Sequence, residues 1–223
     1  MKIKLSRSYL AAAIVLGAVW GFSEAALGMW LRNCASLYSG AIMTGVALFF
    51  LASSWYLSQN ILSVVLLVGI AALFKMFDAL LLSLPLTHGA IGNPIFAFFT
   101  EGMALLLMVM IFNEKLKTKR GGQALMGGMS ALLAVNLFPL VKYITGVPAC
   151  VVPGTGYPLS LYYAPLAVAL SLVTFPLGAW AGAKIQSLES VFQTSSRART
   201  WHYIFSPGTL LLCLAIIAFM RLF

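Results

Sequence analysis

Charged residues are scarce in this sequence: they make up only 9% of its 223 residues, while 61% are hydrophobic. A soluble domain carries about 25% charged residues and roughly 45–50% apolar ones. So few charges would leave the surface of a soluble globule largely apolar. The composition therefore excludes a soluble enzyme, a nucleic-acid-binding domain and a disordered chain, and it indicates an integral membrane protein.

Cysteine and histidine are also rare, with three and two residues respectively. Three cysteines exclude a disulfide framework and a multi-cysteine zinc site. Cys34 and Cys150 both follow predicted spans on the outer side, where a disulfide is possible in an oxidising compartment. We favour two unrelated free thiols. His88 lies in an outer loop, and an exposed histidine is favoured over a soft-metal site with one of these cysteines.

Several catalytic motifs are missing from the sequence, namely the P-loop, the GxSxG elbow, HExxH and CxxC. We therefore expect no enzymatic activity, no catalytic residue, no metal and no cofactor. If the protein transports a solute actively, the energy must come from an ion gradient or from another chain.

Long apolar runs are what the sequence does contain. A bilayer core of about 30 Å needs roughly 20 apolar residues per helix, and the alternation expected of barrel strands is missing. The runs predict an all-α, polytopic membrane bundle: six core helices within residues 1–185, a cytoplasmic linker over 186–202 and a C-terminal transmembrane helix over 203–223. The seven predicted spans are Tyr9–Leu31, Leu37–Leu57, Ile61–Leu84, Pro94–Phe112, Ala124–Tyr143, Leu159–Ile185 and Tyr203–Phe223.

The basic residues predict the orientation of this bundle. Ten of the fourteen fall in segments that an alternating topology places on one side of the membrane, and the positive-inside rule makes that side cytoplasmic. We therefore expect a cytoplasmic N-terminus, a multi-pass location in the bacterial cytoplasmic (inner) membrane, and contact with lipid headgroups rather than nucleic acid. The ten residues are Lys2, Lys4, Arg7, Lys115, Lys117, Lys119, Arg120, Lys184, Arg197 and Arg199.

Only five residues are acidic, and three of them lie inside predicted spans. These are Glu24, Asp78 and Glu101, and two lysines, Lys75 and Lys142, share the same surroundings. A charge at the centre of a membrane helix costs at least about 2.5–3.5 kcal/mol on insertion scales. Five such residues would burden a purely structural bundle, so they are the main sign of function in this sequence.

Helix geometry places these charges at similar depths in the outer half of the bilayer, given a rise of 1.5 Å per residue. One interpretation is that they simply pair. Lys75 and Asp78 are three residues apart on one helix, Glu24 would pair with Lys142, and Glu101 would need a partner or a proton. We favour the other interpretation, a polar cavity that opens to the outer side.

The hypothesis is that a small polar or zwitterionic micronutrient binds in this cavity. The acidic residues would face its cationic or donor groups, the lysines would hold an anionic group, and two neutral residues would add hydrogen bonds. The predicted substrate-binding residues are Glu24, Lys75, Asp78, Glu101, Asn136, Lys142 and Tyr143. Two outer loops, 88–93 and 145–158, would close over the ligand, and their gating residues are His88, Asn93 and Pro153.

A stripe of small residues follows the first predicted helix: Ala13, Gly17, Gly21 and Ala25 recur every four residues. Such spacing lets another helix approach closely in lipid. The stripe predicts either packing inside the bundle or a docking surface for a separate membrane subunit.

With this stripe and its six core helices, the chain resembles the substrate-binding S component of energy-coupling factor (ECF) transporters over about Tyr9–Ile185. The resemblance implies that the protein captures a small-molecule ligand for uptake. It also implies that the stripe docks on a transmembrane coupling subunit that works with ATPases.

Three other functions remain open from the sequence. A self-sufficient secondary transporter would need no partner. An accessory subunit of a larger membrane complex would use its charges to meet another chain. An intramembrane enzyme acting on lipid would use the carboxylates as acid and base.

Overall fold

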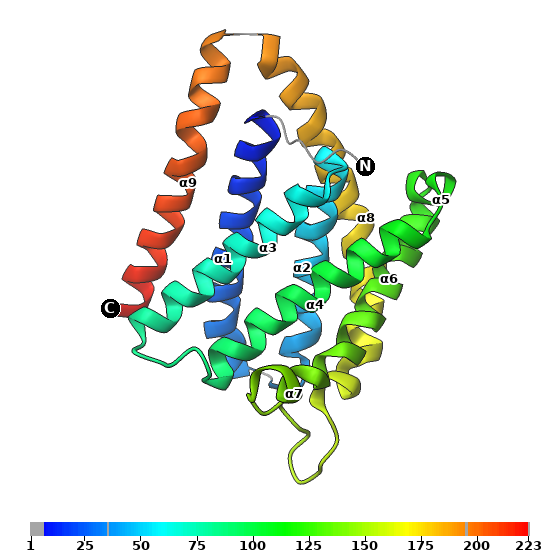
Figure 1. The fold of residues 1–223 in the computed structure, drawn as a ribbon, viewed down its shortest axis with the longest axis vertical. Helices are drawn as coiled ribbons and strands as arrows, with labels where there is room; N and C mark the ends of the chain where they lie inside the picture. Colours follow the sequence, from blue (N-terminus) through cyan, green and yellow to red (C-terminus); the bar gives the residue numbers. More distant parts are fainter. Residues whose placement is uncertain (1–6, 35, 195, 223) are drawn as a thin grey trace.

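The computed structural model describes the backbone of residues 7–34, 36–194 and 196–222, and the side chains of 9–29, 38–188 and 205–222. Figure 1 shows how the helices are arranged. In chain order the elements are α1 (Arg7–Cys34), α2 (Ser36–Ser58), α3 (Ile61–Leu81), α4 (Gly89–Ile111), α5 (Glu114–Thr118), α6 (Arg120–Leu137), a 3₁₀ turn (Phe138–Leu140), α7 (Val141–Thr145), α8 (Leu159–Thr194) and α9 (Ser196–Leu222).

The predicted fold class is confirmed. Seven spans in the described ranges are long and apolar enough to cross a membrane. Across the same ranges no strand forms beyond one isolated bridge between Val151 and Pro158. Helices satisfy their own backbone hydrogen bonds, as a lipid environment demands. The chain is a multi-pass, all-α membrane protein.

Contacts between neighbouring spanning helices hold the bundle together. α2 lies against α8, α6 packs on both α4 and α8, and α1 packs on both α3 and α9. In Figure 1, α3 and α4 cross in front of α2, and α9 runs to the left of α1, which it contacts. The last helix therefore belongs to the packed structure, joined through α1 and α3.

The bundle has two distinct ends. The α7 end carries α7, the 82–88 connection, the 146–158 segment and the C-terminus of α9, while the α5 end carries α5 and the turn at Gln59–Asn60. The described basic residues of the predicted cytoplasmic segments all lie at the α5 end: Lys115, Lys117, Lys119, Arg120 and Lys184. That the α5 end faces the cytoplasm stays a prediction. Lys2, Lys4, Arg7, Arg197 and Arg199 fall outside the residues whose side chains the structure describes.

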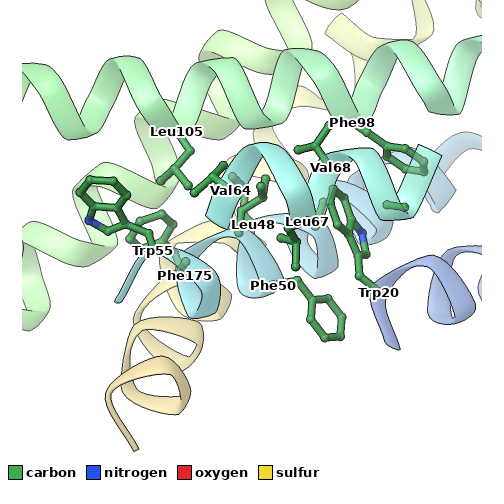
Figure 2. Close-up of a cluster of buried hydrophobic side chains, with 14 of the residues drawn as sticks. Trp20, Leu48, Phe50, Trp55, Val64, Leu67, Val68, Phe98, Leu105 and Phe175 are labelled. Carbon is green, nitrogen blue, oxygen red and sulfur yellow. The ribbon is translucent and has the colours of Figure 1, made fainter. Parts of the chain in front are cut away.

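Side chains from six helices fill the centre of the bundle, and Figure 2 labels ten of them. The indole ring of Trp20 on α1 meets the ring of Phe98 on α4 edge to face, with centroids 5.0 Å apart. Leu48, Leu67 and Phe175 bring α2, α3 and α8 to the same cluster. In lipid this close packing, rather than exclusion of water, holds helices together.

The small-residue stripe of α1 packs inside the bundle. A Cβ atom added at Gly21 would lie 2.6 Å from Phe74 Cγ, and one added at Gly17 would lie 2.9 Å from Ile70 Cβ. Ala13 and Ala25 are buried as well. Of the two interpretations of the stripe, intrabundle packing is confirmed. The predicted partner-docking surface is corrected, because α3 covers it.

α4 begins earlier than its sequence indicated. Pro94 had marked the start, since the residue before a proline disfavours the helical conformation, but the helix starts at Gly89. His88 caps it, its Nδ1 accepting a hydrogen bond of 3.2 Å from the backbone N–H of Ala90. Most of the predicted gating loop 88–93 is therefore the first turn of a helix.

The fifth predicted span lies within the apolar span Arg120–Thr145, but the α-helix α6 in it ends at Leu137. Pro139 has no N–H to continue the helix, and a 3₁₀ turn leads into α7 instead. The predicted linker over 186–202 is helical on both sides of residue 195, in α8 and α9. That this segment links a six-helix core to a separate C-terminal helix stays a prediction.

Candidate functional site

A cavity of about 610 Å³ lies at the α7 end, lined by α1, α2, α3, α4, the start of α8 and the last turn of α9. Pockets that hold small molecules typically measure roughly 300–1,000 Å³. The cavity therefore has room for a small organic solute.

Five acidic and basic side chains stand in the wall of this cavity. Glu24 comes from α1, Lys75 and Asp78 from α3, Glu101 from α4 and Arg221 from α9. The structure thus brings together four of the seven residues predicted to bind substrate. These four come from three separate spans and share one cavity, while their role in binding stays a prediction.

Asp78 is the centre of an ion cluster. Arg221 Nε and Nη2 each donate a hydrogen bond of 2.6 Å, one to Asp78 Oδ1 and the other to Oδ2. Lys75 Nζ donates to Oδ2 over 3.3 Å, which confirms the pairing predicted from the spacing of Lys75 and Asp78. The Asp78 side chain is only 1% exposed, so two cations share one fully buried carboxylate.

The other two carboxylates have no such close partner. Glu24 and Glu101 are each only 4% exposed, and among the described residues no basic nitrogen lies within 4.0 Å of either. At longer range Glu24 is attracted by Lys75, and the charges of Glu24 and Glu101 repel each other. The predicted pair between Glu24 and Lys142 is wrong, because Lys142 is exposed on α7.

Neutral polar groups complete the wall. Asn93, on the first turns of α4, donates through Nδ2 to the carbonyl oxygen of Pro148 over 3.4 Å. Its Oδ1 and the Oγ of Ser160 are buried and have no hydrogen-bond partner in the described part of the chain. Both residues line the cavity. Buried polar atoms are normally paired, and these two are placed where a group in the cavity could pair with them.

The 146–158 segment, predicted to close over the ligand, contributes to the wall through Pro148 and Cys150. Pro153 is exposed and does not line the cavity, and His88 is the exposed cap of α4. Cys150 is a free thiol. Cys34, its possible disulfide partner by sequence, lies outside the described side chains.

Three predicted binding residues lie away from the cavity. Asn136 is exposed and donates to the carbonyl oxygen of Leu132 in its own helix over 2.7 Å. Lys142 is exposed, and Tyr143 is 82% exposed. The prediction assumed one continuous helix over Ala124–Tyr143, but the break at Pro139 turns α7 away from the axis of α6.

The sequence analysis missed Arg221 as a site residue. It had placed the last span outside the six-helix core, although one arginine near the outer end of an otherwise apolar helix was a usable signal. It also missed Ser160 and Tyr163 at the start of α8. A Cβ atom at Gly40 would collide with the ring of Tyr163, so glycine there lets the ring enter the wall.

No family model, curated protein or solved structure matches the chain in comparisons with known proteins. The functional argument accordingly rests on the cavity.

Proposed function

We propose that this membrane protein binds a small polar solute in the cavity at its α7 end and takes part in the uptake of that solute. The observation that carries the proposal is the set of five acidic and basic side chains, from four helices, in the wall of one cavity. Ionisable residues at membrane depth are costly and typically mark solute or ion pathways.

Charge pairing alone accounts for only part of this set. Arg221 and Lys75 compensate Asp78, whereas Glu24 and Glu101 face the cavity without a close counter-ion in the described residues. A bundle that used its charges only for internal stability would have no reason to leave two buried carboxylates beside a hollow.

The proposed setting is the bacterial cytoplasmic membrane, with the α7 end outward. The protein would act there as the solute-binding part of a two-component uptake system, like the ECF S components that it resembles. Any coupling subunit would have to dock on a surface other than the small-residue stripe of α1, because α3 covers that stripe.

A second candidate is a self-sufficient secondary transporter. The burial of the α1 stripe favours it, because the one sequence feature that pointed to a partner is used inside the bundle. Reconstitution of the purified chain alone in liposomes separates the two candidates. Accumulation of solute driven by an imposed ion gradient supports the secondary transporter, and binding without accumulation supports the two-component system.

Native mass spectrometry of the detergent-purified chain tests solute binding. We expect a retained small molecule in the wild-type protein and its loss in Ala97→Leu, because Ala97 lines the cavity and a larger side chain would fill it. Glu101→Lys and Lys75→Glu should also abolish retention. The matched control is Ala169→Leu on the exposed face of α8. Equal retention by Ala97→Leu and Ala169→Leu would exclude the cavity as the binding site.

A further inference from the structure

We infer that the solute is an organic ammonium ion whose cationic group is held by Glu24 and Glu101, with Asn93 Oδ1 and Ser160 Oγ as further acceptors. This inference rests on the proposed function and adds the chemical class of the ligand. The sequence analysis had also expected Lys75 and Lys142 to hold an anionic group of the solute.

The balance of charge in the cavity selects a cation. Its wall holds three carboxylates and two basic groups, so its formal charge is −1 when all are ionised. Both basic groups bind Asp78. Lys142, the second lysine predicted to bind an anion, lies outside. One ammonium group would bring the formal charge of the cavity to zero, whereas a carboxylate or phosphate would add to the excess.

The hydrogen-bonding groups also match an ammonium. An ammonium group donates hydrogen bonds and accepts none. Ionised Glu24 and Glu101 offer only acceptors. The Asn93 amide is oriented by its Nδ2 contact with Pro148, so its unpartnered Oδ1 is an acceptor too. The unpartnered Ser160 hydroxyl serves equally well.

The rest of the wall suits an organic body rather than a bare metal ion. Phe98, Phe138 and Tyr163 contribute aromatic rings, and aromatic rings accommodate both apolar groups and organic cations. Among the described residues, no group of three or more histidine, cysteine or acidic side chains is placed to hold a metal. A cavity of about 610 Å³ also far exceeds the volume of a single ion.

A panel of simple probes tests the inference on the full-length chain in detergent. The cations are benzylammonium, butylammonium and benzyltrimethylammonium, the neutral analogues are benzyl alcohol and butanol, and the anions are benzoate and butyrate. The readout is the unfolding temperature, because a ligand that binds only the folded state raises it with concentration. We expect a saturable rise with one or more cations at millimolar concentration and none with neutral or anionic analogues.

Matched variants locate the binding. Glu24→Gln and Glu101→Gln keep the side-chain shape and should abolish the rise, whereas Glu114→Gln, on the exposed helix α5, should not change it. Ser160→Ala leaves both carboxylates in place and removes one acceptor. It should weaken the apparent Kd for the ammonium by roughly 10- to 150-fold, since a hydrogen bond to a charged group contributes about 1.5–3 kcal/mol.

The outcomes separate this inference from the proposed function. A rise with neutral or anionic probes that Ala97→Leu abolishes would overturn the ammonium assignment and leave solute binding intact. A cation response that persists in both folded Gln variants would also overturn the assignment. No response to any probe would count against the cavity as a solute site altogether.

Discussion

Arg221 on α9 and Asp78 on α3 lie 143 residues apart in the chain, yet they form two hydrogen bonds of 2.6 Å each. Both line the cavity. The contact ties the last transmembrane helix to the core and places its final turn in the wall of the candidate site. The helix that the sequence analysis placed outside the six-helix core therefore contributes to the candidate site.

The first prediction concerns the stability of this ion cluster. Asp78→Asn leaves the guanidinium of Arg221 and the ammonium of Lys75 without their shared counter-ion. Removing one partner of a buried pair typically costs about 3–5 kcal/mol. We expect a loss of stability of this order, measured by reversible denaturation in mild detergent. The double variant Asp78→Asn/Arg221→Met should lose less than the sum of the two single losses.

A surface pair in the same chain provides the control. Glu114 and Lys117 lie 2.7 Å apart on α5, and the Glu114 side chain is 85% exposed. Such pairs contribute about 0–1 kcal/mol, so Glu114→Gln should have a small effect. Equal losses for Asp78→Asn and Glu114→Gln would show that the cluster does not hold α9 in place.

The second prediction concerns the close approach of α1 and α3. Gly21→Ala would place a Cβ atom 2.6 Å from Phe74 Cγ, and overpacking of this kind typically costs about 1–3 kcal/mol. Gly69→Ala on α3 is the matched control, because nothing lies within 4 Å of its added Cβ. We expect Gly21→Ala to lower the free energy of unfolding and Phe74→Ala to relieve part of that loss in the double variant. If Gly21→Ala is tolerated as well as Gly69→Ala, α3 does not cover the stripe.

The third prediction concerns orientation. Cys150 is an exposed free thiol at the α7 end, and Cys213 is buried. In a chain carrying Cys34→Ser and Cys213→Ser, a membrane-impermeant maleimide should label Cys150 in intact cells. Thr118 is exposed on α5. In a chain whose single cysteine is Thr118→Cys, labelling should occur only after the cells are permeabilised. The reverse pattern would place the basic α5 end outside.

Much of the fold follows from apolar run length, because a bilayer requires continuous helices of about 20 residues. Local chemistry explains where the predicted boundaries failed. His88 supplies a cap that starts α4 before Pro94, and Pro139 ends α6 before Tyr143. Such effects depend on a single side chain and leave no trace in hydropathy.

The candidate site was predictable where depth alone decided the outcome, as for Glu24 and Glu101. It was not predictable where rotation about a helix axis mattered. Asn136 lies at a suitable depth but faces outward, and Arg221 reaches Asp78 only because α9 packs against α1 and α3. Helix rotation and helix neighbours are set by packing of the whole bundle, which a list of spans does not contain.

Cysteine accessibility at two positions of α4 tests the central claim, a cavity at the α7 end that is open to water-soluble solutes, most directly. In a cysteine-free chain, Ala97→Cys places a thiol in the cavity wall, and Met103→Cys places one on the side of the helix away from it, where Met103 is 50% exposed. The measurement is the rate of modification by a water-soluble methanethiosulfonate in membranes. The account predicts rapid modification at position 97 and little at position 103; an unreactive thiol at 97 would contradict it.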